Sequence, residues 1–172
     1  MRRLAFLAAL AAVLAAPTLS LAGESTPGDG TLSIKRGRGV VILNVRGAIL
    51  FRVAKGRITA KDPDITDGSG IQVAGCDNSR VDRSDDFPDV DVVKVCKGTD
   101  LKLRAIGGRY QVIVTGSGIF GSVVARGVVK LHGANDPTVA DGVYSLNGDD
   151  YKSLPEDPLT LTLAAPTPSP GG

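Results

Sequence analysis

Three glycines in the stretch GSGIFGSVVARG, residues 116–127, are the first candidates for chemistry. Gly116, Gly118 and Gly121 stand at G-x-G-x-x-G spacing, which in dinucleotide-binding proteins lets the backbone approach a pyrophosphate. That site also needs a helix N-terminus after the glycines, but the residues that follow are β-branched and interrupted by Gly127. The stretch therefore predicts glycines that bend, bulge or turn strands, and no cofactor.

Groups for nucleophilic or acid–base catalysis are sparse. His132 is the only histidine, and no G-x-S-x-G elbow surrounds Ser69, Ser117 or Ser122. A hydrolase that uses paired carboxylates stays open as a third reading, because 18 acidic residues can always supply two neighbours. We predict no catalytic residues and a protein that is not an enzyme.

Oxygen ligands for calcium occur in two loops. One is DPDITDG, residues 62–68, and the other is the segment 77–91 with Asp82, Asp85, Asp86, Asp89 and Asp91. Neither loop has the spacing of an EF-hand, and Asp also favours turns for its own backbone hydrogen bonds. We predict no metal site and keep a calcium-dependent adhesion-type module as the alternative function.

The segment DNSRVDRSDDFPDVD, residues 77–91, is the preferred contact surface, because long loops carry function more often than short ones. It contains Phe87, the one aromatic residue outside positions that suit a strand. Flat aromatic platforms for carbohydrate are otherwise lacking, since the chain has no tryptophan.

The N-terminal residues 1–22 have the pattern of a secretory signal peptide. Arg2 and Arg3 precede an apolar run from Leu4 to Ala16, and small residues precede a cut after Ala22. We expect a secreted or cell-envelope-associated protein, exported by the general route rather than the twin-arginine route. No later apolar stretch is long enough to cross a membrane, so no membrane insertion is expected after cleavage.

The two cysteines, Cys76 and Cys96, are therefore expected to form a disulfide in an oxidising compartment. Two separate buried thiols are the alternative.

Charge gives no basis for nucleic-acid binding. Of the 20 Lys and Arg, Arg2 and Arg3 leave with the signal, which leaves 18 against 18 Asp and Glu. Residues 23–61 are basic and residues 62–100 are acidic, which predicts solvated faces that attract each other within the fold.

Apolar residues recur at every second position beyond residue 30, which predicts short half-buried strands. The expected strands are 30–36, 39–46, 49–54, 57–61, 70–76, 91–97, 100–106, 109–116, 122–132, 142–147 and 158–164. Many short strands with glycine turns predict one all-β domain over residues 23–164, a β-sandwich or barrel. The Pro-rich residues 165–172 are expected to form a disordered tail.

We interpret residues 37–62 and 108–133 as two copies of one unit. At an offset of 71 they share eight identities in 26 positions, and alternating apolar residues fall on the same face in both copies. The alignment predicts two pseudo-symmetric halves, although a shared bias toward glycine and valine would also raise such a score.

The run GRYQVIVTGSGIFGSVVARGVVKLHG, residues 108–133, resembles the central segment of uncharacterised secreted all-β proteins of high-GC actinobacteria. The likeness lies in the GRY strand, the glycine pair, the small Ser122 and a basic residue followed by glycine before the last strand. It is strongest over residues 31–133. The resemblance implies an all-β fold and export, and brings no activity or ligand.

These observations together predict an exported, non-enzymatic β module with a binding or structural role at or outside the cell envelope. Its partner is expected to be an unknown protein or envelope component.

Overall fold

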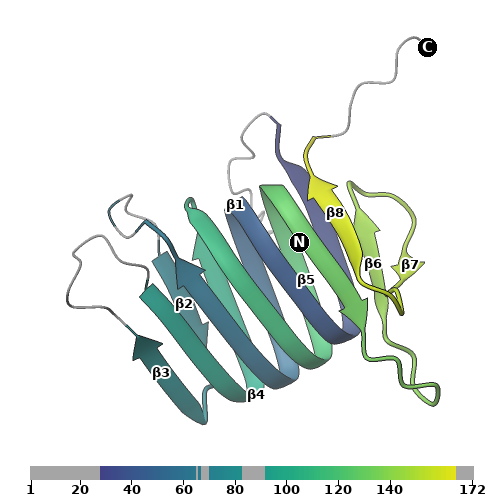
Figure 1. Cartoon of the computed structure of the whole chain (residues 1–172), viewed down its shortest axis with the longest axis horizontal. Helices are drawn as coiled ribbons and strands as arrows, with labels where there is room; N and C mark the ends of the chain where they lie inside the picture. Colours follow the sequence, from purple (N-terminus) through teal and green to yellow (C-terminus); the bar gives the residue numbers. More distant parts are fainter. Residues whose placement is uncertain (1–27, 65, 67–69, 83–91, 166–172) are drawn as a thin grey trace, which may run out of the picture.

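A computed structural model of the chain describes residues 28–64, 66, 70–82 and 92–165, and within these ranges every regular element is a β-strand (Figure 1). The predicted all-β class is confirmed. No helix that could cross a membrane occurs in the described ranges. The predicted signal peptide and all of the predicted tail except Ala165 lie outside them.

Eight strands follow one another in the described chain, and three of them are unusually long. The long strands are β1 (Gly30–Asp62), β4 (Val92–Ile106) and β5 (Arg109–Gly133). The short strands are β2 (Gly70–Ala74), β3 (Asn78–Asp82), β6 (Val143–Leu146), β7 (Lys152–Ser153) and β8 (Leu159–Leu163).

The long strands correct the expected division into short ones. The four strands predicted between residues 30 and 61 are one strand of 33 residues, β1, and β4 and β5 each join two predicted strands. A glycine in a sequence suggests a turn, but a glycine can also bend a strand while the backbone hydrogen bonds continue on both sides. Bends inside continuous strands replace the predicted turns.

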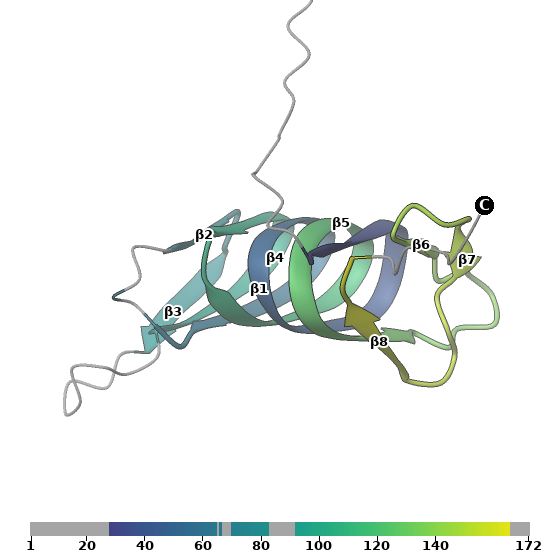
Figure 2. The same ribbon diagram turned by 90° about the horizontal axis from the view of Figure 1, so that it is seen from above.

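β1 and β5 pair with each other twice, in two antiparallel registers. Residues 30–46 of β1 pair with residues 109–125 of β5, and residues 39–61 pair with residues 111–133. Ile42, for example, lies opposite both Ile113 and Lys130. Because one strand edge cannot hold two partners, β1 has β5 on both edges, and the two strands wind around each other as a coil (Figure 2).

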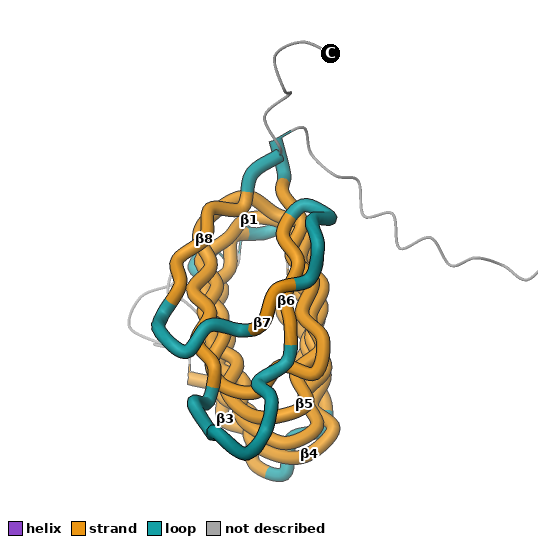
Figure 3. The backbone as a smooth tube through the Cα atoms, turned by 90° about the vertical axis from the view of Figure 1, so that its right-hand side faces the viewer, coloured by secondary structure: helices purple, strands orange, loops and turns teal. Residues whose placement is uncertain are grey.

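The coil is flattened into two facing layers (Figure 3). The strand pairing defines what we call the first layer. In it the following segments lie side by side, flanked by β3 and β8: residues 92–97, 57–62, 109–116, 39–46 and 127–133. The second layer contains residues 101–106, 48–54, 117–125 and 30–35, flanked by β2 and by β6 with β7. The sheet runs from β2 to β8 without closing, so the two layers form a sandwich-like arrangement and not a barrel.

The core lies between the layers and follows the predicted alternation. Val41, Leu43 and Val45 are buried and the residues between them are exposed. Tyr110 is fully buried, and its hydroxyl donates to the Ile106 carbonyl at 2.7 Å and accepts from the Gly108 amide at 3.2 Å. The phenol is thus satisfied inside an otherwise apolar core.

Five glycines stand in a row across one crease between the layers. In cross-strand order this glycine row is Gly98, Gly56, Gly116, Gly39 and Gly133, each opposite the next. A Cβ atom on Gly39 would lie 2.2 Å from the His132 carbonyl oxygen, and one on Gly116 would lie 2.2 Å from that of Lys55. The backbones approach too closely for any side chain, so the crease depends on glycine.

The two predicted copies, residues 37–62 and 108–133, lie in the mutually paired parts of β1 and β5. Ile42 lies opposite Ile113, which is the residue matched to it at the offset of 71. The pairing does not itself establish a repeat, and the two-copy architecture stays a prediction.

A disulfide joins Cys76, which follows β2, to Cys96 in β4, with a Cα–Cα distance of 5.2 Å. The predicted pair is formed, and it closes a loop with a sequence separation of 20. A loop of this length contributes roughly 3 kcal/mol on the chain-entropy account. The disulfide indicates an oxidising, extracytoplasmic environment.

We expect Gly39→Ala to lower the free energy of unfolding by at least about 2 kcal/mol, because the methyl group meets backbone and the residue has φ +129°. Gly70→Ala is the matched control, since a Cβ there meets nothing within 4 Å. Urea unfolding of both variants measures the difference. Equal stability of the two variants would contradict the role of the glycine row.

Candidate functional site

The glycines first considered for nucleotide binding lie inside a strand. β5 continues through Gly116, Gly118 and Gly121, so no helix N-terminus follows them. Gly116 belongs to the glycine row, and a Cβ on Gly121 would lie 2.5 Å from the Phe51 ring. Their spacing reflects close packing of strands.

The remaining sequence candidates do not assemble into a reactive cluster within the described residues. His132 lies near the end of β5, opposite Val40, with a half-buried side chain. No group of three or more His, Cys, Asp or Glu side chains there could hold a metal ion. Phe87 and the acidic residues Asp67, Asp85, Asp86, Asp89 and Asp91 lie outside the described ranges, as does the Asp82 side chain.

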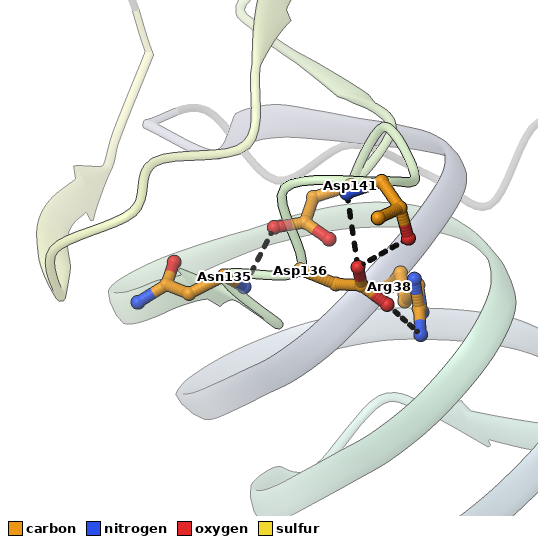
Figure 4. Close-up of polar contacts among 5 residues, drawn as sticks. Arg38, Asn135, Asp136 and Asp141 are labelled. Carbon is orange, nitrogen blue, oxygen red and sulfur yellow. Dashed lines mark hydrogen bonds and ion pairs between the residues drawn. The ribbon is translucent and has the colours of Figure 1, made fainter.

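Two carboxylates do come together, on the loop after β5 (Figure 4). Asp136 accepts hydrogen bonds from the Thr138 hydroxyl at 2.6 Å and amide at 3.0 Å, and forms an ion pair with Arg38 at 2.9 Å. Asp141 accepts from the Asn135 amide at 3.0 Å, and its carbonyl accepts from the Arg38 amide at 2.8 Å. The Asp136 carboxylate thus binds the loop to itself and to β1, whereas the Asp141 carboxylate binds within the loop and only its backbone carbonyl contacts β1.

The electrostatics of Asp136 fit this structural role. The Thr138 hydrogen bonds, followed by Arg38, lower the pKa of Asp136 to about 2. A carboxyl group that holds its proton so weakly is a poor general acid, and its lone pairs already accept hydrogen bonds. The hydrogen bonds and the ion pair of Asp136 therefore serve to fix the loop.

A groove of about 500 Å³ runs along the glycine row on the outside of the molecule. Gly56, Gly98 and Gly116 give it a floor of bare backbone. The other residues that line it have polar or charged end groups, although most of the wall surface is carbon: Lys55, Arg57, Lys97, Thr99, Thr115, Asn78 and Asp77. We call it the glycine-row groove, and it continues into a smaller hollow that shares Arg57, Asn78 and Lys97.

Strand register explains why cations gather there. Arg57 lies directly opposite both Lys97 and Thr115, and Lys55 lies opposite Thr99. The three cations are exposed, and none has an ion-pair partner within the described part of the chain. Asp77, whose amide donates to the Lys97 carbonyl at 2.9 Å, is the one carboxylate in the wall.

A second groove, of about 600 Å³ on the second layer, is also lined by cations, but three of these have partners. Arg52 and Lys102 lie 2.8 Å and 3.6 Å from the Asp100 carboxylate, whose pKa is lowered first by the Arg52 hydrogen bond. Lys35 lies 3.9 Å from the centre of the Tyr151 ring, and its hydrogen bond lowers the pKa of Tyr151. Side chains that are already held by a partner are less free to turn toward an anion, whereas Lys55, Arg57 and Lys97 have no ion-pair partner among the described residues, so we take the glycine-row groove as the candidate site.

The expected attraction between the basic residues 23–61 and the acidic residues 62–100 accounts for only some of the ion pairs. Arg52 and Asp100 do join residues 23–61 to residues 62–100. Arg38 instead meets Asp136, beyond both segments.

Comparisons with known family models, curated proteins and solved structures find no match to this chain. The resemblance to actinobacterial secreted proteins therefore stays a prediction.

Asp136→Asn is expected to lower the melting temperature at neutral pH. The pKa of Asp136 is depressed in the folded protein, so its stabilisation is present above its ordinary pKa of 3.8 and is lost as the pH falls through about 2. The gap between wild type and variant should close over that interval in a pH series of thermal melts. Asp157→Asn, an exposed carboxylate, is the control. A gap independent of pH would contradict the assignment.

Proposed function

We propose that the protein is an exported, non-enzymatic binding module, acting at or outside the cell envelope, that holds anionic groups in the glycine-row groove. One observation carries this proposal: three exposed cations without ion-pair partners among the described residues line a groove whose floor is bare backbone. Export is supported by the disulfide and by the predicted signal peptide.

The chemistry of the groove suits phosphate, sulfate or carboxylate. The Arg57 guanidinium can donate two parallel hydrogen bonds to such a group, while Lys55 and Lys97 add point charges. Hydroxyl donors from Thr99 and Thr115 complete the wall.

The cross-strand arrangement also favours a ligand. Arg57 and Lys97 lie directly opposite each other, and like charges in that position destabilise a sheet. A bound anion would offset this repulsion. No residue in the groove forms a nucleophile–base pair, which supports binding without reaction.

Titration with pyrophosphate, followed by calorimetry and amide NMR shifts, tests the proposal. The variant Arg57→Gln with Lys97→Gln should bind at least about tenfold more weakly, since each hydrogen bond to a charged group contributes about 1.5–3 kcal/mol. Shifts should centre on Gly56, Gly98 and Gly116.

The matched control removes two cations from the other layer, Lys102→Gln with Arg104→Gln, and should leave pyrophosphate affinity unchanged. Equal weakening by both double variants, or no binding by the wild type, would overturn the proposal.

A further inference from the structure

A second set of cations lies on the outer face of the first layer, at the end away from the glycine row. Arg46 lies opposite Arg109 on one edge of its strand and opposite Arg126 on the other. All three side chains are exposed. We call these three residues the arginine row.

The arginine row is unfavourable for the fold by itself. Side chains directly opposite on neighbouring strands have Cβ atoms about 5 Å apart, where like charges repel. Arg126 has one counterion, Asp29, at 3.4 Å. Arg46 and Arg109 have no ion-pair partner within the described residues. Such a row is what a site for an anionic ligand requires, because its charges stay available.

The arginine row and the glycine-row groove lie on one continuous surface. Arg109 and Thr115 are six residues apart on the same strand segment, and Thr115 lies opposite Arg57, so the two sites are about 20 Å apart. Lys61 and Lys130 lie between them, opposite Gln111 and Ile42.

Asp77 lies in the wall of the groove and Asp29 lies beside Arg126, but the strand segments that connect the two sites carry no acidic residue. These segments are residues 39–46, 57–61, 109–116 and 126–132.

We propose that the ligand is a linear polyanion that lies across the outer face of the first layer, from the glycine-row groove to the arginine row. This inference rests on the proposed function and extends it from a single anionic group to a polymer. Several phosphate or sulfate groups held in sequence would engage both sites at once, and the linkage would raise affinity beyond that of either site.

The surface favours a polymer without bases. Single-stranded nucleic acids bind to aromatic side chains on which bases stack. Of the described aromatic residues, Phe51, Tyr110 and Tyr144 are buried, and Phe120 lies on the second layer. Tyr151 lies beside Ser33 and Lys35 of that layer.

The surface also lacks the side chains that enter a bilayer. Its most exposed apolar residues are Ile42, Ile113 and Val128, with exposed fractions of 39%, 43% and 40%. These are short β-branched side chains, without the Trp, Phe or Leu that insert into lipid.

The test compares pyrophosphate with long-chain polyphosphate on the intact mature chain. Arg46→Gln with Arg109→Gln should leave pyrophosphate affinity unchanged and weaken polyphosphate binding at least about tenfold. The same variant should raise the melting temperature by about 1 to 5 °C, because it removes repulsion across the sheet. Lys102→Gln with Arg104→Gln, in the second layer, should change neither affinity.

The outcomes separate the two proposals. The first outcome is that the arginine-row variant keeps its polyphosphate affinity while the Arg57 and Lys97 variant binds pyrophosphate more weakly. This result overturns the proposal of a polymeric ligand but leaves the proposed function standing. Affinities insensitive to the Arg57 and Lys97 variant overturn the proposed function. Tighter binding to a single-stranded oligonucleotide, or to phosphatidylglycerol vesicles, than to polyphosphate overturns the choice of polymer.

Discussion

The fold depends on the close approach of backbones along the glycine row. Where β1 crosses the crease at Gly39, it passes between Gly116 on one side and Gly133 on the other. The same contact recurs at Gly56, between Gly98 and Gly116. A side chain at Gly39, Gly56 or Gly116 would collide with a carbonyl oxygen of the neighbouring strand, so the strands could not turn the corner while still paired. Continuous strands with partners on both edges therefore require glycine at the crease.

The same constraint creates the candidate site. Glycines leave the outer surface of the crease without side chains, and residues on either side point outward in the usual strand alternation. Lys55 and Arg57 flank Gly56, while Lys97 and Thr99 flank Gly98. Paired strands bring these neighbours together as two charged walls over a floor of backbone. The groove is thus a consequence of the way in which the sheet bends.

Sequence patterns predicted the strand class, the alternating core and the disulfide, because each depends on local spacing or on compartment. The period of two places Val41 and Leu43 on the buried face. Gly116 is expected from the sequence to bend or turn a strand, and it lies in the glycine row inside β5. The groove and the arginine row could not be predicted, since both depend on register between distant strands. Arg57 and Lys97 become neighbours through the pairing of β1 with β4, and Arg46 lies between Arg109 and Arg126 only because β1 pairs with β5 along both edges. The basic composition of residues 23–61 is the one signal available in the sequence, and it predicts only solvated faces.

Backbone NMR of residues 23–172 tests the double pairing most directly. Cross-strand proton contacts should join Gly39 to both Gly116 and Gly133 within one molecule, as the two registers require. Contacts from Gly39 to one of these glycines alone, or a second contact that appears only between differently labelled copies, would contradict the coiled two-layer sheet and the groove that follows from it.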